Sequence, residues 1–145
     1  MQQQFSEHHE LGQAYRELLS LCDRLETLAD SIPRRIDLTS CRAIMTELPE
    51  KLRRVHALEE MILFPAVEDQ RMDDGRDALI ARLRAEHDQD DRAAVELVRV
   101  LKAVLDNRAS LSWDAIGYML RGFFETVRRH VATERLLLWR HACPI

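Results

Sequence analysis

Three histidines in this sequence are each followed by a carboxylate four residues later. The pairs are His56 with Glu60, His87 with Asp91, and His130 with Glu134. Because an α-helix has about 3.6 residues per turn, positions four apart lie on one face. Each pair could therefore point at one metal ion or at two adjacent ions, and the pattern predicts a metal site built from helices.

A fourth histidine, His8, also lies on an apolar stripe. Four imidazoles and two glutamates in a core cost several kcal/mol for each unpaired ion, so something must neutralise them. Two divalent metals with a bridging hydroxide would nearly balance the glutamates and leave the imidazoles neutral. Imidazole with carboxylate suits iron, manganese or zinc, and no cysteine lies near these residues in the sequence.

Several neighbouring residues are open to more than one interpretation. Asp91 could ligate a metal, hydrogen-bond a metal-bound water, or be solvated. Tyr15 most simply fills the core, but it could donate a hydrogen bond to a metal-bound oxygen. Glu59 and Glu86 each precede a stripe position by one residue and are expected to be surface charges, although Glu86 could reach the rim of the bundle. A single histidine on an apolar stripe is more often a hydrogen-bonded core residue, so the metal hypothesis depends on the whole set.

Hydrophobic periodicity predicts four long helices that would position these residues. They are expected from Ser6 to Ala29 or Asp30, from Thr39 or Ser40 to about Gln70, from about Arg76 to Asn107, and from Ser110 or Ser112 to about His141. Ser6 is the expected N-cap of the first helix. Pro49 is expected to kink or split the second helix, and Pro65 to disturb its last turn. Residues 71–75 read as a turn.

Short connections make successive helices antiparallel, which predicts an all-α fold, an up-down-up-down four-helix bundle in one domain over residues 1–145. The first helix starts at one end of the bundle, and His8 lies within a turn of that end. His56 and His130 fall in the upper parts of helices that rise toward the same end. His87 is eleven residues down the third helix, roughly 16 Å at about 1.5 Å per residue. We therefore expect all six groups in one layer.

The composition excludes several classes of protein. With 145 residues, 46% hydrophobic and 32% charged, the chain reads as one soluble globular domain. A net charge of −4 with interspersed signs gives no case for nucleic acid, and no apolar run is long enough to span a membrane. The start of the chain lacks the features of a signal peptide. Three scattered cysteines favour reduced thiols and a cytoplasmic location. Ferritin-type Glu-x-x-His pairs and His-Glu-x-x-His are absent from the sequence.

The segments VHALEEMILFP and RHVATERLLLW resemble the two His-x-x-x-Glu helices of the hemerythrin-like, or HHE cation-binding, family. The resemblance covers nearly the whole chain. It implies a non-haem di-iron centre, oxo- or hydroxo-bridged, with manganese or zinc as alternative metals. The implied ligands are His8, His56, Glu60, His87, His130 and Glu134, the two glutamates bridging. His9 is the alternative first ligand, although the stripe phase favours His8. Asp91 stands where respiratory hemerythrins have a fifth histidine, which argues against a reversible oxygen carrier of the usual kind.

Two functions follow from this resemblance, and a third stands apart from it. The first is a module that binds or senses dioxygen or a related diatomic such as nitric oxide. The second is a redox enzyme acting on peroxide or nitric oxide, or a protein that repairs iron centres or handles iron. Asp91 as a proton relay would favour this second function. The third is a metal-free helical interaction protein. A homodimer is a further option that the sequence leaves open.

Overall fold

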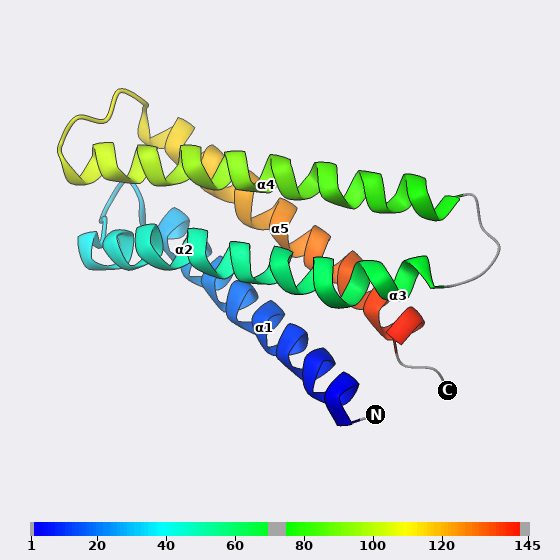
Figure 1. Ribbon diagram of the computed structural model, residues 1–145. Helices are drawn as coiled ribbons and strands as arrows, with labels where there is room; N and C mark the ends of the chain where they lie inside the picture. Colours follow the sequence, from blue (N-terminus) through cyan, green and yellow to red (C-terminus); the bar gives the residue numbers. More distant parts are fainter. Residues whose placement is uncertain (1, 70–74, 143–145) are drawn as a thin grey trace.

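Four helical rods make up the described part of the computed structural model, residues 2–69 and 75–142 (Figure 1). The elements are α1 (Gln2–Ser31), α2 (Leu38–Leu58), the π-helical turn η1 (Glu59–Leu63), α3 (Phe64–Glu68), α4 (Gly75–Leu105) and α5 (Trp113–Ala142). α2, η1 and α3 follow one another without a break and form the second rod. Successive rods reverse direction along the chain. The predicted all-α four-helix bundle is confirmed, while the expected turn at 71–75 lies mostly outside the described residues.

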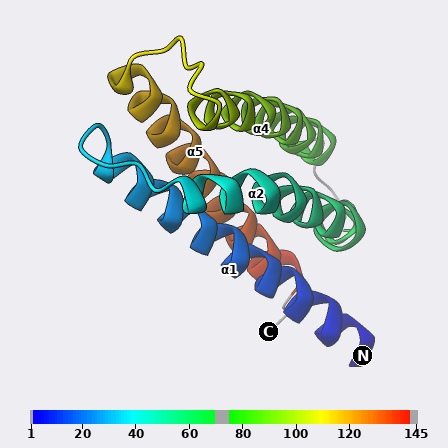
Figure 2. The ribbon, with the colours of Figure 1, turned by 90° about the vertical axis from the view of Figure 1, so that its left-hand side faces the viewer.

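Each rod packs against at least two others, and the second rod also meets α5 through η1 and α3. α1 contacts α2 and α5, and α4 contacts α2 and α5, so the four rods enclose a shared interior (Figure 2). Apolar stripes from all the rods fill it. Its largest fully buried side chains include Leu18, Ile44, Leu97 and Phe124. The start of α1 and the end of α5 lie at one end of the bundle, the end at which α3 finishes.

The helix ends differ from the sequence expectation in two places. α1 already begins at Gln2, so the prediction of Ser6 as its N-cap is wrong. α2 begins at Leu38, one residue before the expected Thr39, and the carboxylate of Asp37 caps it by accepting hydrogen bonds from the N–H groups of Thr39 and Ser40. At α5 the hydroxyl of Ser112 accepts from the N–H of Ala115, one of the two caps expected there.

The second rod is irregular next to Pro65, as predicted. α2 continues through Pro49 without a break, so a split there is wrong and a kink stays a prediction. The irregularity comes at η1, where the N–H of Phe64 donates to the carbonyl of Glu59, five residues back rather than four. Pro65 follows directly, and its ring would clash with the carbonyl of Met61 in a regular α-helix. A widened turn next to Pro65 relieves that clash, and such turns are frequent at functional sites.

Candidate metal centre

Three ligand-type side chains converge inside the bundle from α2, η1 and α4. In His56, Glu59 and His87 one ligand atom from each lies within 4.8 Å of the other two. The imidazole rings of His56 and His87 stack with their centroids 3.9 Å apart. Glu59 is fully buried and His87 is nearly so. One metal ion could be bound by all three residues.

Two buried carboxyl groups lie against His87. Glu59 Oε1 is 3.1 Å from His87 Nε2, and Glu134 Oε1 is 3.9 Å from the same nitrogen. Glu59 and Glu134 are close enough for each to shift the pKa of the other. From α1, the hydroxyl of Tyr15 donates to Glu59 Oε2 at 2.9 Å. All four rods therefore contribute to one layer, and two glutamates from different rods meet at its centre.

The charges in this layer are unfavourable for the protein alone. Burial raises the pKa of Glu59 to about 7. Burial and the neighbouring Glu59 raise the pKa of Glu134 to about 10. Burial and the nearby His87 lower the pKa of His56 to about 4. Without a cation at neutral pH, Glu134 retains its proton, Glu59 is close to half protonated and His56 is neutral. A divalent cation would replace those protons and would leave the imidazoles free to ligate.

His56 carries the clearest sign of a missing partner. Its Nδ1 is buried and has no hydrogen-bond partner. Asp91 Oδ1 lies 3.1 Å away but without the alignment of a hydrogen bond. A buried, unpaired imidazole nitrogen costs free energy unless something binds it. The donor set and this orphaned nitrogen together fit a metal ion.

His130 lies at the α4 side of α5 and has its own acidic partners. Its Nδ1 is 2.7 Å from Asp90 Oδ2, and its Nε2 is 3.8 Å from Glu86 Oε2. The hydrogen bond to Asp90 raises the pKa of His130. His130 is not part of the three-residue group, although it is close enough to Glu134 for each to shift the pKa of the other.

Two of the residues expected as ligands lie away from the layer. Glu60 is exposed and forms a two-bond ion pair with the guanidinium of Arg84, at 2.9 and 3.0 Å. Glu59, which was expected on the surface, occupies the buried position in its place. His8 is half-buried and lies two turns before Tyr15, roughly 10 Å along the axis of α1. In this structure Tyr15, not His8, is the α1 side chain at the level of Glu59.

The family model of the hemerythrin HHE cation binding domain matches residues 6–140. The chain belongs to this family. No curated protein and no solved structure matches it. Membership of a cation-binding family and the buried His/Glu cluster together indicate that this HHE domain binds a metal. None of its described helices has the length and hydrophobicity of a membrane span.

Sequence reasoning missed Glu59 and Asp90 in the HHE domain, although signals for both exist. Positions three and four residues after a histidine share its face, so spacing alone cannot choose between Glu59 and Glu60. On α4 the buried positions alternate strictly by three and four. They are Ile80, Leu83, His87, Asp90, Ala94, Leu97 and Leu101. A strict alternation would therefore have selected Asp90 rather than its neighbour Asp91.

A groove of about 430 Å³ between α2 and α4 leads from the surface to the two stacked histidines. It is lined by Arg53, His56, Ala57, Glu60, Arg84, His87, Asp88 and Asp91. The ion pair of Arg84 with Glu60 lies in this groove, and the guanidinium of Arg84 also covers the ring of Phe64. The histidines of the HHE domain can therefore be reached by small polar molecules.

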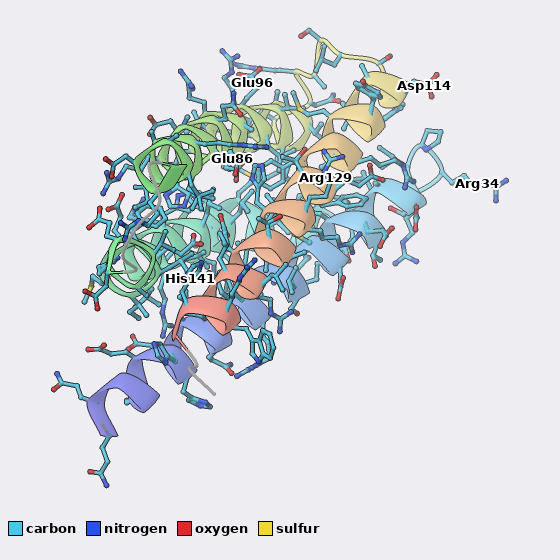
Figure 3. All side chains as sticks on the ribbon, turned by 90° about the vertical axis from the view of Figure 1, so that its right-hand side faces the viewer. Arg34, Glu86, Glu96, Asp114, Arg129 and His141 are labelled. Atoms are coloured by element: carbon cyan, nitrogen blue, oxygen red, sulfur yellow. The ribbon has the colours of Figure 1, made fainter. Side chains whose placement is uncertain are left out.

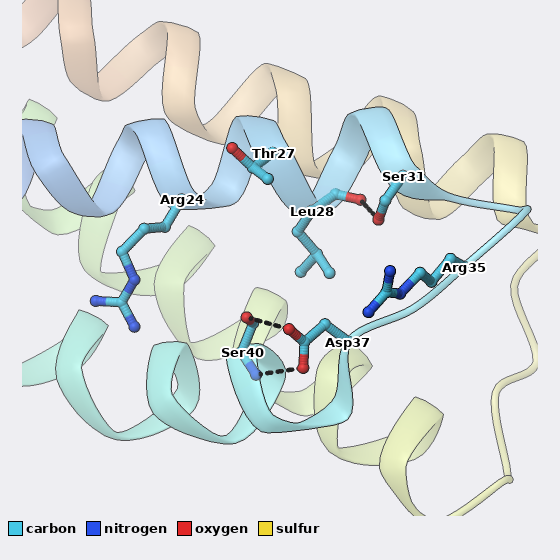
Figure 4. Close-up of a pocket in the computed structure, with 7 residues that line it drawn as sticks. All are labelled: Arg24, Thr27, Leu28, Ser31, Arg35, Asp37 and Ser40. Carbon is cyan, nitrogen blue, oxygen red and sulfur yellow. Dashed lines mark hydrogen bonds between the residues drawn. The ribbon is translucent and has the colours of Figure 1, made fainter.

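A second cavity, of about 280 Å³, lies near the connection between α1 and α2 (Figure 4). Its hydroxyl groups are already used as donors. Thr27 donates to the carbonyl of Asp23, Ser31 to that of Leu28, and Ser40 to the carboxylate of Asp37. Arg24, at one side, pairs with Glu47. These bonds account for the hydroxyl groups and Arg24 as parts of the local structure.

Proposed function

We propose that this HHE domain holds a non-haem di-iron centre in its core and binds or senses dioxygen or a related diatomic there. The observation that carries the proposal is the buried group of His56, Glu59 and His87 with Glu134 beside it. Two glutamates from different rods at the centre of a layer suit a pair of cations better than one. Imidazole with carboxylate is a donor set that iron accepts, as do manganese and zinc.

The residues that would hold the metals are His56, Glu59, His87, Glu134 and, after a small movement, His130. Bound iron supplies an open coordination position and a change of oxidation state. His8 and Glu60 remain candidate ligands, and each would have to move to reach the layer. An exposed ion pair such as Glu60 with Arg84 contributes little free energy, so its loss would not prevent such a movement.

The chain itself prepares the site for these metals. The hydroxyl of Tyr15 fixes the orientation of Glu59 before any metal binds. The ring of Phe64, almost fully buried, stacks against His87 with the centroids 5.4 Å apart. This apolar wall limits water on one side of His87, while the groove between α2 and α4 leaves another side accessible.

The proposal is tested by metal content and absorption of protein produced with added iron. About two irons per chain and a near-ultraviolet ligand-to-metal band in air would support it. His87→Ala should lose both, whereas Val95→Ala, at an exposed position of the same helix, should keep both. No metal, or one zinc per chain, would contradict a di-iron centre.

A redox enzyme acting on peroxide or nitric oxide is the second candidate. The open groove favours it, because Asp91 lies in that groove at 3.1 Å from His56 Nδ1 and could pass a proton. Steady-state consumption of peroxide or nitric oxide that is lost in His56→Ala and reduced in Asp91→Asn would support the enzyme. Binding without turnover would favour the sensing module. An iron-handling role would show instead as transfer of bound iron to an acceptor protein.

The proposal includes a cytoplasmic location and allows a homodimer. Cys22 and Cys41 are buried free thiols, which supports a reducing compartment such as the cytoplasm. A homodimer would be visible as a doubled mass in solution.

A further inference from the structure

Asp90 is a buried acid that the proposed ligand set does not use. It projects inward from α4, is 6% exposed, and follows His87 by three residues. Its Oδ2 lies 2.7 Å from Nδ1 of His130, which joins α4 to α5 across the interior of the bundle. A buried carboxylate is retained at a cost unless it is hydrogen-bonded. The hydrogen bond with His130 therefore accounts for the burial of the Asp90 carboxylate.

The contact fixes which ring nitrogen of His130 carries hydrogen. An ionised carboxylate only accepts, so the bond requires a hydrogen on Nδ1 of the imidazole. In the neutral ring the lone pair is then on Nε2. That nitrogen faces Glu86 Oε2 at 3.8 Å, on the side of α4 that borders α5, where Figure 3 labels Glu86. Without Asp90 the neutral ring could take either tautomer.

We propose that Asp90 is a positioning residue of the metal centre, acting through His130. Asp90 holds His130 in the Nδ1–H tautomer and in one orientation, so that Nε2 is free to bind a metal ion. The inference rests on the proposed metal-binding function. Carboxylates that hold a ligating histidine in this manner typically change metal affinity by about 10- to 100-fold.

The test compares three variants, Asp90→Ala, Asp90→Asn and Glu96→Ala. Glu96 is the matched control, because it is an acid on the same helix whose partner is Arg99, outside the layer. The first measurement is the tautomer of His130 by nitrogen NMR of the metal-free protein, at a pH above the pKa of His130. The second is the affinity for cobalt(II), measured by competition with a chelator.

The wild type and Glu96→Ala should show the Nδ1–H tautomer and the same cobalt affinity. Asp90→Ala should lose the single tautomer and bind cobalt about 10- to 100-fold more weakly. Asp90→Asn, whose amide oxygen can still accept from Nδ1, should recover part of the affinity. If Asp90→Ala does not fold, the comparison of Asp90→Asn with the wild type still tests the inference.

Unchanged tautomer and affinity in both Asp90 variants would overturn the inference while leaving the metal site intact. Wild-type protein that binds no cobalt, zinc or iron would instead contradict the proposed function. The NMR measurement still reports on the Asp90–His130 pair in that case, so the two failures are distinguishable.

Discussion

The hydroxyl of Tyr15 donates a hydrogen bond to Glu59 Oε2 at 2.9 Å, joining residues 44 positions apart in the sequence. Both side chains are fully buried. The bond connects α1 to the π-helical turn η1 and sets the level at which α1 meets the histidines. Among the described residues it is the one side-chain hydrogen bond between the first rod and the buried carboxyl pair.

Tyr15→Phe should destabilise the metal-free protein by about 1–3 kcal/mol, because the ring stays buried while Glu59 loses its donor. Denaturant unfolding of metal-free protein measures this change. Tyr118→Phe is the matched control, since Tyr118 is 84% exposed. Equal stabilities of the two variants would mean that the bond contributes nothing.

The two adjacent acids of η1 should behave differently in metal binding. Glu59→Gln should lower the metal content strongly, because a carboxylate oxygen of Glu59 lies within 4.8 Å of a ring nitrogen of His56 and of His87, close enough for the three to share a metal ion. Glu60→Gln should keep most of the metal, because Glu60 pairs with Arg84 at the surface. Elemental analysis of both variants after identical loading checks this prediction. The reverse order would show that metal binding exchanges the two acids in the core, as the His-x-x-x-Glu spacing predicts.

The sequence specifies the bundle more fully than the site. Apolar stripes place His87, His130 and Glu134 correctly in the interior, because burial follows helical periodicity over many residues. The choice between Glu59 and Glu60 depends on a single turn. There η1 departs from α-helical spacing next to Pro65, and Arg84 on the neighbouring helix α4 provides the surface partner of Glu60. The position of α1 along the bundle axis was also not predicted. The contact of Tyr15 with Glu59 depends on how far α1 is shifted along the second rod, which helical periodicity does not determine.

Stability of the metal-free protein should fall as pH rises through the neutral range. Glu134 has a folded pKa of about 10, above its ordinary value of 4.5. A raised carboxyl pKa contributes stability at low pH that is lost as pH rises toward the folded pKa. His56 acts in the opposite direction only below its ordinary pKa of 6.5.

Between pH 7 and 9 the free energy of unfolding should therefore decrease, at up to about 1.4 kcal/mol per pH unit. Urea unfolding at several pH values measures the slope. The series ends at 9.0, the ordinary pKa of a thiol such as Cys22, because its burial adds a separate effect above that value. Glu134→Gln should reduce the slope to the part contributed by His130, whose pKa is also raised, and an unchanged slope in this variant would exclude Glu134 as its cause.

Removing the metal should lower the melting temperature. A ligand present at about 100 times its Kd stabilises the folded state by about 2.7 kcal/mol, which corresponds to roughly 5–10 °C for a domain of this size. Thermal unfolding before and after chelation, followed by re-addition of iron, measures the change. A melting temperature that is insensitive to chelation of metal-loaded protein would argue for the metal-free interaction protein instead.

The most direct test of the metal centre is the number of irons per chain in protein produced with added iron, read together with its absorption spectrum. The layer built from His56, Glu59, His87 and Glu134 predicts about two irons and a near-ultraviolet band, both lost in His87→Ala. Protein that contains no metal, or that keeps its iron in His87→Ala, would contradict the assignment.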